Sequence, residues 1–144
     1  MKPTDKHPLQ TYFEAKGYLR RKPYIFIILG LFVFTILTQM AGLQQLKAAG
    51  VNVEEAKNVI MPLWVNIVLL CATASAIPAV IMRARDSGLP PQIFGGLFAL
   101  NILLGLVQML TGNALPEILT QAIGFMNFIA VLALMFRPSS VAHD

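Results

Sequence analysis

The sequence predicts an all-α integral membrane protein, a four-helix transmembrane bundle with both termini in the cytoplasm (N-in/C-in). Three observations predict it: few charged residues, four long uncharged stretches, and basic residues concentrated on one side of those stretches. Apolar residues make up 56% of the chain and charged residues 12%, whereas soluble domains carry about 25% charged residues. The apolar residues also form long runs and are not scattered at helical or strand spacing, which argues against a soluble core.

Four stretches contain no Asp, Glu, Lys, Arg or His, and each is long enough for a helix to cross the hydrocarbon core, which takes about 20 residues. Helix is expected because lipid leaves backbone polar groups no partner outside the segment, and a barrel would show alternating polarity. We place the whole chain, 1–144, in a single transmembrane domain with a cytoplasmic N-terminal segment at 1–22. The predicted spans are 24–42, 59–82, 92–111 and 117–136.

The first span could be mistaken for a secretory signal peptide. Its polar lead, residues 1–22, is long, and its apolar run exceeds the roughly 7–15 residues of a signal-peptide core. An uncleaved helix is therefore favoured, with Pro23 at its start, where the missing N–H costs nothing.

The second helix is expected to begin outside the bilayer. Asn52 followed by Glu55 makes a partial capping box, which predicts a helix start near Val53. Pro62 would then fall in the early turns, and Pro78 would kink the helix within the membrane.

Glycine and proline residues predict the helix ends and turns in the rest of the chain. Gly88 and Pro90 end the second helix and set a short turn. Asn113 can cap the fourth helix, with Pro116 in its first turn and Pro138 after its end. Because these connections are short, consecutive helices are expected to pack antiparallel.

Orientation follows from the charge pattern. Lys47 and Lys57 are the basic residues of one side, and the other nine of eleven lie on the opposite side. The positive-inside rule places that richer side in the cytoplasm of a bacterial-type inner membrane. A nucleic-acid patch is the weaker interpretation, because a juxtamembrane basic cluster already has a partner in anionic lipid headgroups. The nine residues are Lys2, Lys6, Lys16, Arg20, Arg21, Lys22, Arg83, Arg85 and Arg137.

One candidate site is the charged turn after the second span, formed by Arg83, Arg85, Asp86 and Gly88. Its structural interpretation is an anchor for topology: arginines suit a helix C-terminus, Asp86 can pair with either arginine, and Gly88 can adopt the left-handed cap conformation. Its functional interpretation is a contact for lipid headgroups or for a protein partner.

A second candidate set is the intramembrane amides Asn66, Asn101 and Asn127. Asn101 and Asn127 lie at the same depth, so they could bond each other as a clamp between helices. Alternatively, all three could line a path for a small solute. Asn66 also belongs to a looser outer set, either a polar vestibule or amides at headgroup depth, with Gln39, Gln108 and Gln121.

Catalytic chemistry is not indicated. Apart from Glu117 at the edge of the fourth span, no Asp, Glu, Lys, Arg or His lies inside a predicted span, and proton relays and many ion pathways need such groups. His7 and His143 are far apart, Cys71 is a single cysteine, and no phosphate loop or nucleophile elbow is present. We therefore expect neither an enzyme nor a metal or other cofactor.

The segment 78–89, which carries Pro78 and the run from Arg83 to Gly88, resembles the signature of the domain of unknown function 805 family, the YhaH-like small bacterial inner-membrane proteins. The basic and aromatic residues Phe13, Arg20, Arg21 and Tyr24 before the first span are similar to that family too. The resemblance covers roughly residues 13–98. It implies a small multi-helix inner-membrane protein and supplies no substrate or catalytic residue.

The expected role is that of an accessory or scaffold subunit, packed against itself as a homo-oligomer or against a larger membrane complex. The alternatives are a carrier or pore for a small neutral solute and a holin-like lesion former, the latter suggested by small size and basic ends.

Overall fold

The computed structural model describes residues 17–52, 61–112 and 115–140. Their regular structure is entirely helical, without a strand in these three ranges. Each helix is long and apolar enough to cross a membrane, so the all-α prediction with four such helices is confirmed. The helices are α2 (Arg21–Ala48), α3 (Leu63–Asp86), α4 (Pro91–Thr111) and α5 (Glu117–Phe136).

Three of the helices contain their predicted spans, and α3 differs at both ends. α3 begins at Leu63, and Met61 and Pro62 are not helical, so the prediction that this helix runs through Pro62 is wrong. Proline disfavours helical conformation in the residue before it, here Met61, so the helix cannot continue upstream of Pro62. Pro62 itself is the N-cap of α3 and not an early-turn residue. The predicted start near Val53, with Glu55 in its capping box, lies outside the described residues.

At its other end α3 continues beyond the predicted boundary at Met82 and stops at Asp86. Its last turn therefore includes Arg83 and Arg85. Positive side chains interact favourably with the carbonyls at a helix C-terminus, so this turn can form despite its charge. The extension places Asp86 in the helix and not in the connecting loop.

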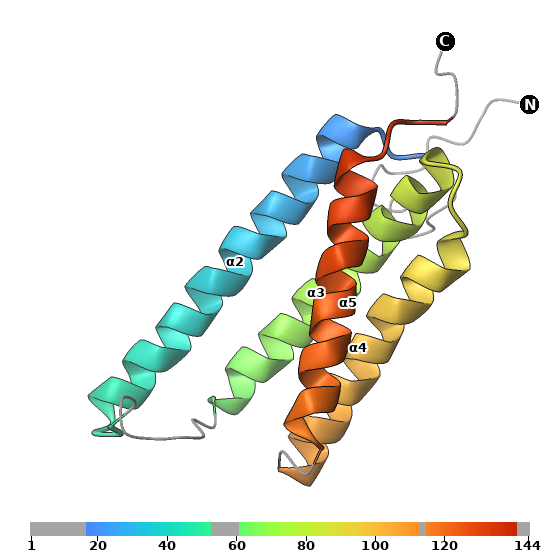
Figure 1. Ribbon diagram of the computed structural model, residues 1–144. Helices are drawn as coiled ribbons and strands as arrows, with labels where there is room; N and C mark the ends of the chain where they lie inside the picture. The colour runs from blue at the N-terminus through green and yellow to red at the C-terminus, as the bar shows by residue number, and fades with distance from the viewer. Residues whose placement is uncertain (1–16, 53–60, 113–114, 141–144) are drawn as a thin grey trace, which may run out of the picture.

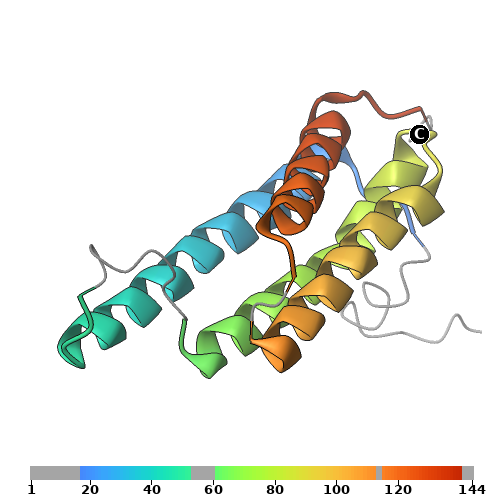
Figure 2. The same ribbon diagram turned by 60° about the horizontal axis from the view of Figure 1, so that its bottom comes forward.

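Consecutive helices run antiparallel (Figure 1). The starts of α2 and α4 and the ends of α3 and α5 therefore lie together at one end of the bundle, at the top of Figure 1. α3 is central, packing against α4, α2 and α5, and α5 also contacts α2 and α4. Figure 2 shows α5 between α2 on one side and α3 and α4 on the other.

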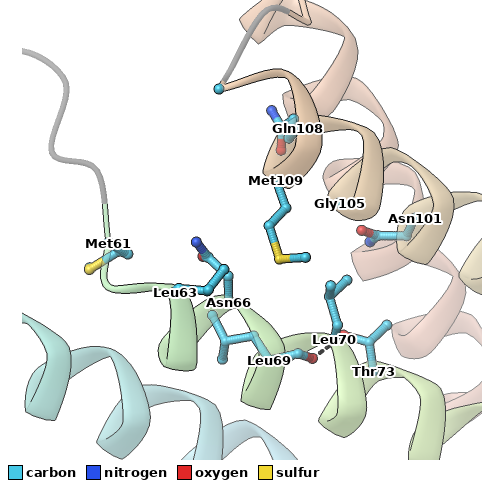
Figure 3. A pocket seen from close by; sticks show the side chains of 11 residues that line it. Met61, Leu63, Asn66, Leu69, Leu70, Thr73, Asn101, Gly105, Gln108 and Met109 are labelled. Carbon is cyan, nitrogen blue, oxygen red and sulfur yellow. Dashed lines mark hydrogen bonds between the residues drawn. The ribbon is translucent and has the colours of Figure 1, made fainter.

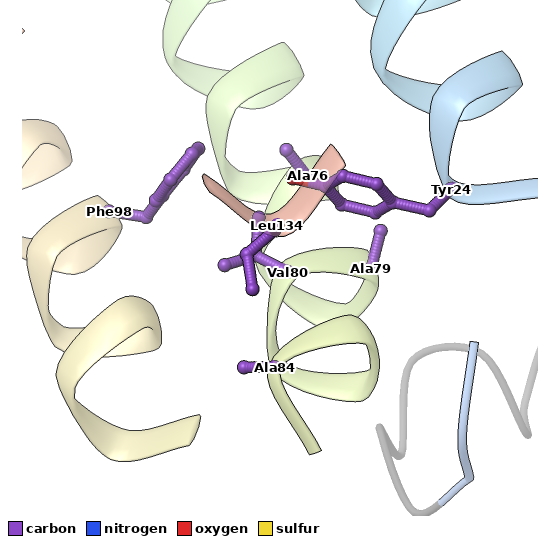
Figure 4. Packing of buried hydrophobic residues seen from close by; sticks show 7 residues of the cluster. All are labelled: Tyr24, Ala76, Ala79, Val80, Ala84, Phe98 and Leu134. Atoms are coloured by element: carbon purple, nitrogen blue, oxygen red, sulfur yellow. The ribbon is translucent and has the colours of Figure 1, made fainter. Parts of the chain in front are cut away.

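The tightest packing is at that same end. Tyr24 of α2, Phe98 of α4 and Leu134 of α5 converge on α3 (Figure 4). The α3 face that receives them is made mostly of alanines, small residues that allow helices to approach closely. We call this set the core cluster: Tyr24, Ala76, Ala79, Val80, Ala84, Phe98 and Leu134.

The outer surface carries many large apolar side chains. Phe26 is 75% exposed, Leu110 80% and Ile118 78%. Water-soluble domains rarely expose contiguous apolar surface on this scale. The described charged residues lie at the two ends of the bundle. Lys47 and Glu117 are at one end, and the core-cluster end holds Arg20, Arg21, Lys22, Arg83, Arg85, Asp86 and Arg137.

Candidate functional site

A buried ion pair closes the core-cluster end. Arg83 and Asp86 are three positions apart, which puts them on the same face of α3, and the Arg83 guanidinium donates to the Asp86 carboxylate. Neither residue has exposed surface. Charges are rarely buried unless they are paired and hydrogen-bonded, so the remaining polar atoms of both side chains need partners.

Arg83 finds those partners at the end of α5. Its Nε donates to the Leu134 carbonyl at 3.0 Å, and Nη2 donates to the Arg137 carbonyl. Nη1, which also contacts Asp86, lies 3.2 Å from Ser139 Oγ. The guanidinium thus binds one position in the last turn of α5 and two positions after it, and two of the three contacts are with main-chain carbonyls.

Asp86 is held by the same segment. Ser139 Oγ donates to Asp86 Oδ2 at 2.6 Å, and the Asp86 carbonyl accepts from Ser140 N at 2.8 Å and Ser140 Oγ at 3.0 Å. Arg137 Nε donates to the Ser87 carbonyl at 3.1 Å. We call this assembly the Arg83 cluster: Arg83, Asp86, Ser87, Arg137, Ser139 and Ser140. It joins α3 to segment 137–140.

Gly88 completes the turn after α3. Its φ is 67°, a left-handed backbone conformation that residues other than glycine adopt only at a cost in free energy. Space is short as well, because a Cβ at this position would lie 2.9 Å from Ser140 Oγ. The glycine therefore allows segment 137–140 to lie directly against the turn.

The segment before α2 reaches α3 at the same end. Leu19 N donates to the Met82 carbonyl at 3.4 Å, and Arg85 Nη1 donates to the Gly17 carbonyl at 3.3 Å. Arg83 and Arg85 therefore point to different neighbours. Arg83 binds the segment after α5, and Arg85 binds the segment before α2.

The four predicted residues of the charged turn thus split into two groups. Arg83, Asp86 and Gly88 meet segment 137–140, whereas Arg85 does not belong to that group. The predicted contact with lipid headgroups or a partner stays a prediction, and the two residues with no exposed surface, Arg83 and Asp86, have their hydrogen bonds inside the chain.

Sequence reasoning missed the other half of the Arg83 cluster. Ser139 and Ser140 follow Pro138, which indicated only a helix end. The carbonyls of Leu134 and Arg137 are main-chain acceptors and leave no residue signature. One signal was present in the sequence. A buried arginine has five N–H donors, more than one carboxylate can accept, so Arg83 needs acceptors besides Asp86.

The first cavity lies between α3 and α4, towards the end of the bundle opposite the Arg83 cluster, and has a volume of about 450 Å³. Asn66 and Thr73 of α3 and Asn101 and Gln108 of α4 line it (Figure 3). Thr73 is satisfied within its helix through the Leu69 carbonyl. The amides give this cavity its polar character.

The second cavity, of about 420 Å³, lies between all four helices. Its lining is mainly apolar, and its polar groups include Thr35, Asn101 and Asn127. Asn101 and Thr73 line both cavities, whereas Asn66 lines the first and Asn127 the second. The three predicted amides therefore do not share one cavity.

Asn127 does not bond Asn101 as the clamp hypothesis expected. Its Nδ2 donates to the Ile123 carbonyl of the same helix at 2.9 Å. Its Oδ1 is buried and has no hydrogen-bond partner among the described residues. Asn127 is 7% exposed, so this acceptor has no compensating access to solvent.

The geometry defines a class: an all-α protein of four helices with membrane-spanning length and apolarity, closed at one end by a buried ion pair. The chain belongs to the family described as Protein of unknown function (DUF805), whose model matches residues 12–143. The family resemblance predicted from the sequence is thereby confirmed. The match extends beyond residues 13–98 and includes segment 137–140. No curated protein and no solved structure matches the chain.

Proposed function

We propose that this protein is a four-span protein of the bacterial inner membrane, with both termini in the cytoplasm, and that it acts as an accessory or scaffold subunit of a membrane assembly and not as an enzyme. The observation that carries the proposal is the Arg83 cluster. Its charged and hydroxyl groups bind one another and the main chain, an arrangement suited to fixing helix ends.

Membrane insertion is supported by the outer surface. In the most apolar 18-residue stretch of α2, only 11% is buried inside the bundle. Phe32 on this helix is 60% exposed. Such a surface is stable in lipid, where exposed apolar side chains have no cost and helices satisfy their own backbone.

The proposed orientation rests on the charges at the two ends. Arg20, Arg21, Lys22 and Arg137 are exposed at the core-cluster end. Lys47 and Glu117 are the described charged residues at the opposite end, and they balance each other. The positive-inside rule assigns the core-cluster end to the cytoplasm.

Contacts with the end of α3 hold the two segments that carry these exposed cations. Segment 137–140, which carries Arg137, is held by Asp86, and the segment before α2 is held by Met82 and Arg85. Each basic residue near an anionic membrane surface contributes about 1 kcal/mol to attraction. We call these exposed residues the basic platform: Arg20, Arg21, Lys22 and Arg137. The platform would contact anionic headgroups and bind a partner subunit.

A second candidate is a carrier for a small neutral solute, which the first cavity favours because Asn66 and Asn101 both line it. A carrier must also open towards the cytoplasm. The core cluster and the Arg83 cluster close that end, so this function would require the most tightly packed part of the protein to separate.

The proposal can be tested by purifying the tagged full chain from its native membrane in a gentle detergent and identifying co-purifying proteins by mass analysis. A stoichiometric larger partner is expected, and it should be lost or reduced in the Arg20→Gln/Arg21→Gln/Lys22→Gln variant of the platform. A variant with Lys47→Gln is the matched control at the opposite end and should retain the partner. Recovery of the chain with nothing attached would overturn the accessory role.

Topology is tested separately with reporter fusions. Alkaline phosphatase, which is active only outside the cytoplasm, should be active when inserted after Gly50 and inactive after Gly88. A fluorescent protein that folds in the cytoplasm should give the reverse pattern. Phosphatase activity after Gly88 together with fluorescence after Gly50 would reject the proposed orientation without affecting the partner experiment.

A further inference from the structure

The first cavity carries hydrogen-bonding groups that the protein itself does not use. Asn66, Asn101 and Gln108 line it, and no hydrogen bond joins their amides to another described residue. The amides are also accessible, because the buried side-chain polar atoms without a partner among the described residues are the Tyr24 hydroxyl and Asn127 Oδ1. The volume of about 450 Å³ lies within the range of about 300–1,000 Å³ typical of small-molecule sites.

The polar groups of the cavity lie at two levels. Asn66 and Thr73 are seven positions apart on α3, and Asn101 and Gln108 are seven positions apart on α4. Seven residues make about two helical turns, so the members of each pair lie on one side of their helix and about 10 Å apart. Because the helices are antiparallel, Asn66 and Gln108 form the outer level, and Thr73 and Asn101 form the deeper one (Figure 3).

The cavity opens at the end of the bundle opposite the Arg83 cluster. Leu63, the first residue of α3, and Gly112, the C-cap of α4, both line it. Both are exposed, Leu63 to 60%, so the mouth lies between them. At the deeper level Thr73 and Asn101 also line the second cavity, whose wall reaches the core cluster through Phe98. A molecule bound here would therefore leave by the mouth through which it entered, which differs from the path of a carrier.

The lining selects an uncharged ligand rich in hydroxyl groups. The described residues that line the cavity include no Asp, Glu, Lys, Arg or His, and an ion that loses its hydration without a counter-charge is disfavoured. Each free amide both donates and accepts, as a hydroxyl group does. Between the two polar levels the lining is Leu69, Leu70 and Gly105, which suits the C–H surface of a sugar or polyol.

We propose that the first cavity is a binding site for an uncharged, hydroxyl-rich molecule of disaccharide or glycosylglycerol size. Its hydroxyl groups bind Asn66 and Gln108 at the outer level and Asn101 at the deeper one. The same chemical group is present in a free solute and in the headgroup of a glycolipid, and either source satisfies the lining. This site is independent of the accessory role, which rests on the opposite end of the bundle.

The test is methyl NMR of the full-length protein in lipid nanodiscs, labelled with ¹³C at the methionine methyl groups. Met61 and Met109 line the first cavity, and Met135 lines the second. The free probes are lactose, sucrose, trehalose and glucosylglycerol. At least one should shift Met109 and Met61 in a saturable way and leave Met135 unchanged. Lactobionate, the negatively charged counterpart of lactose, should bind no better than lactose does.

The lipid source is tested in a second set of nanodiscs that contain glucosyl diacylglycerol. Shifts of Met109 and Met61 in these discs without any free sugar would identify a glycolipid headgroup as the ligand. Shifts with the free probes alone would identify a solute. Both faces of a nanodisc are open to solution, so neither result depends on the topology or partner experiments.

Three variants assign the contacts. Asn66→Leu and Asn101→Leu should each raise the Kd about three- to thirtyfold, the effect of losing one hydrogen bond in a membrane protein. Asn127→Leu, an asparagine of the second cavity, is the matched control and should leave the Kd unchanged. The methionine spectrum of each unliganded variant shows whether its fold is retained.

Three results would overturn the proposal. The first is no saturable shift with any free probe or with the glycolipid, which is expected if the cavity holds only water. The second is a shift of Met135 equal to that of Met109, which indicates nonspecific binding. The third is an unchanged Kd in both Asn66→Leu and Asn101→Leu.

Discussion

Arg83 and Asp86 form an ion pair without exposed surface, and each is also hydrogen-bonded to segment 137–140, more than 50 positions away in the sequence. The pair therefore joins two helix ends and does not merely cap one. The contribution of this pair to the free energy of unfolding can be measured because the chain contains one tryptophan, Trp64. Trp64 lies at the opposite end of α3, where its Nε1 donates to Gln45 of α2, so its fluorescence reports unfolding away from the sites of mutation.

Asp86→Asn should lower the free energy of unfolding by about 3–5 kcal/mol, because breaking a buried pair leaves the other charge uncompensated. The double variant Arg83→Met/Asp86→Leu should recover part of this loss, because neither charge then remains buried. The measurement is chemical unfolding in mild detergent followed by Trp64 fluorescence. Arg85→Met, on a partly exposed neighbour, is the control and should cost clearly less. Equal losses for Asp86→Asn and Arg85→Met would contradict the role of the pair.

Ser139→Ala should destabilise the protein by about 1–3 kcal/mol, because the buried Asp86 and Arg83 each lose a hydrogen bond to a charged group while keeping their ion pair. The serine hydroxyl both donates to Asp86 and accepts from Arg83. Arg137→Ala should have a smaller effect. It removes the hydrogen bond from the exposed Arg137 side chain to the Ser87 carbonyl, but it keeps the main-chain carbonyl of residue 137 that Arg83 binds. The same unfolding assay decides, and a larger loss for Arg137→Ala than for Ser139→Ala would be inconsistent with this bonding.

Gly88→Ala should cost more than Gly112→Ala. Both glycines have similar left-handed φ values, 67° and 64°, and alanine in that conformation costs about 1–2 kcal/mol. At Gly112 a Cβ would meet nothing within 4 Å, whereas at Gly88 it would lie 2.9 Å from Ser140 Oγ. The difference between the two variants isolates the contact between the turn and segment 137–140. Identical losses of unfolding free energy would mean that segment 137–140 does not contact the turn at Gly88.

Gly105→Ala should weaken the packing of α3 against α4. A Cβ on Gly105 would lie 2.7 Å from Leu70 Cδ2, whereas Gly96 on the same helix has nothing within 4 Å. Gly96→Ala should therefore be neutral or stabilising by up to about 1 kcal/mol through helix propensity. Leu70→Ala combined with Gly105→Ala should restore space for the methyl group. Thermal unfolding in detergent compares the three variants, and equal midpoints for the two single variants would exclude the contact.

Sequence reasoning located the helices well where charge and proline set their ends. α5 coincides with its predicted span because Pro116 and Arg137 bound it sharply. α3 was misplaced at both ends, for two different reasons. Pro62 was expected inside the helix although it suits the cap, and the predicted span ended at Met82, where the charges begin, although the helix continues to Asp86.

The candidate sites were less accessible to sequence reasoning. The importance of Arg83, Asp86 and Gly88 was predicted from their residue types, but their contacts with segment 137–140 depend on the position of α5. The equal depth of Asn101 and Asn127 was taken to favour a bond between them. Depth along two helices says nothing of rotation about each axis, and Asn127 is turned so that its donor meets its own helix.

The long sequence separation within the Arg83 cluster has a consequence for biosynthesis. Arg83 is translated before Leu134, Arg137 and Ser139, its partners 51 to 56 positions downstream. Until α5 has been inserted, the nascent chain therefore carries an arginine that lacks most of its hydrogen-bond acceptors. The cluster closes only when the fourth helix arrives in the correct orientation, so in incomplete or inverted chains Arg83 keeps its ion pair with Asp86 and lacks its acceptors at the end of α5.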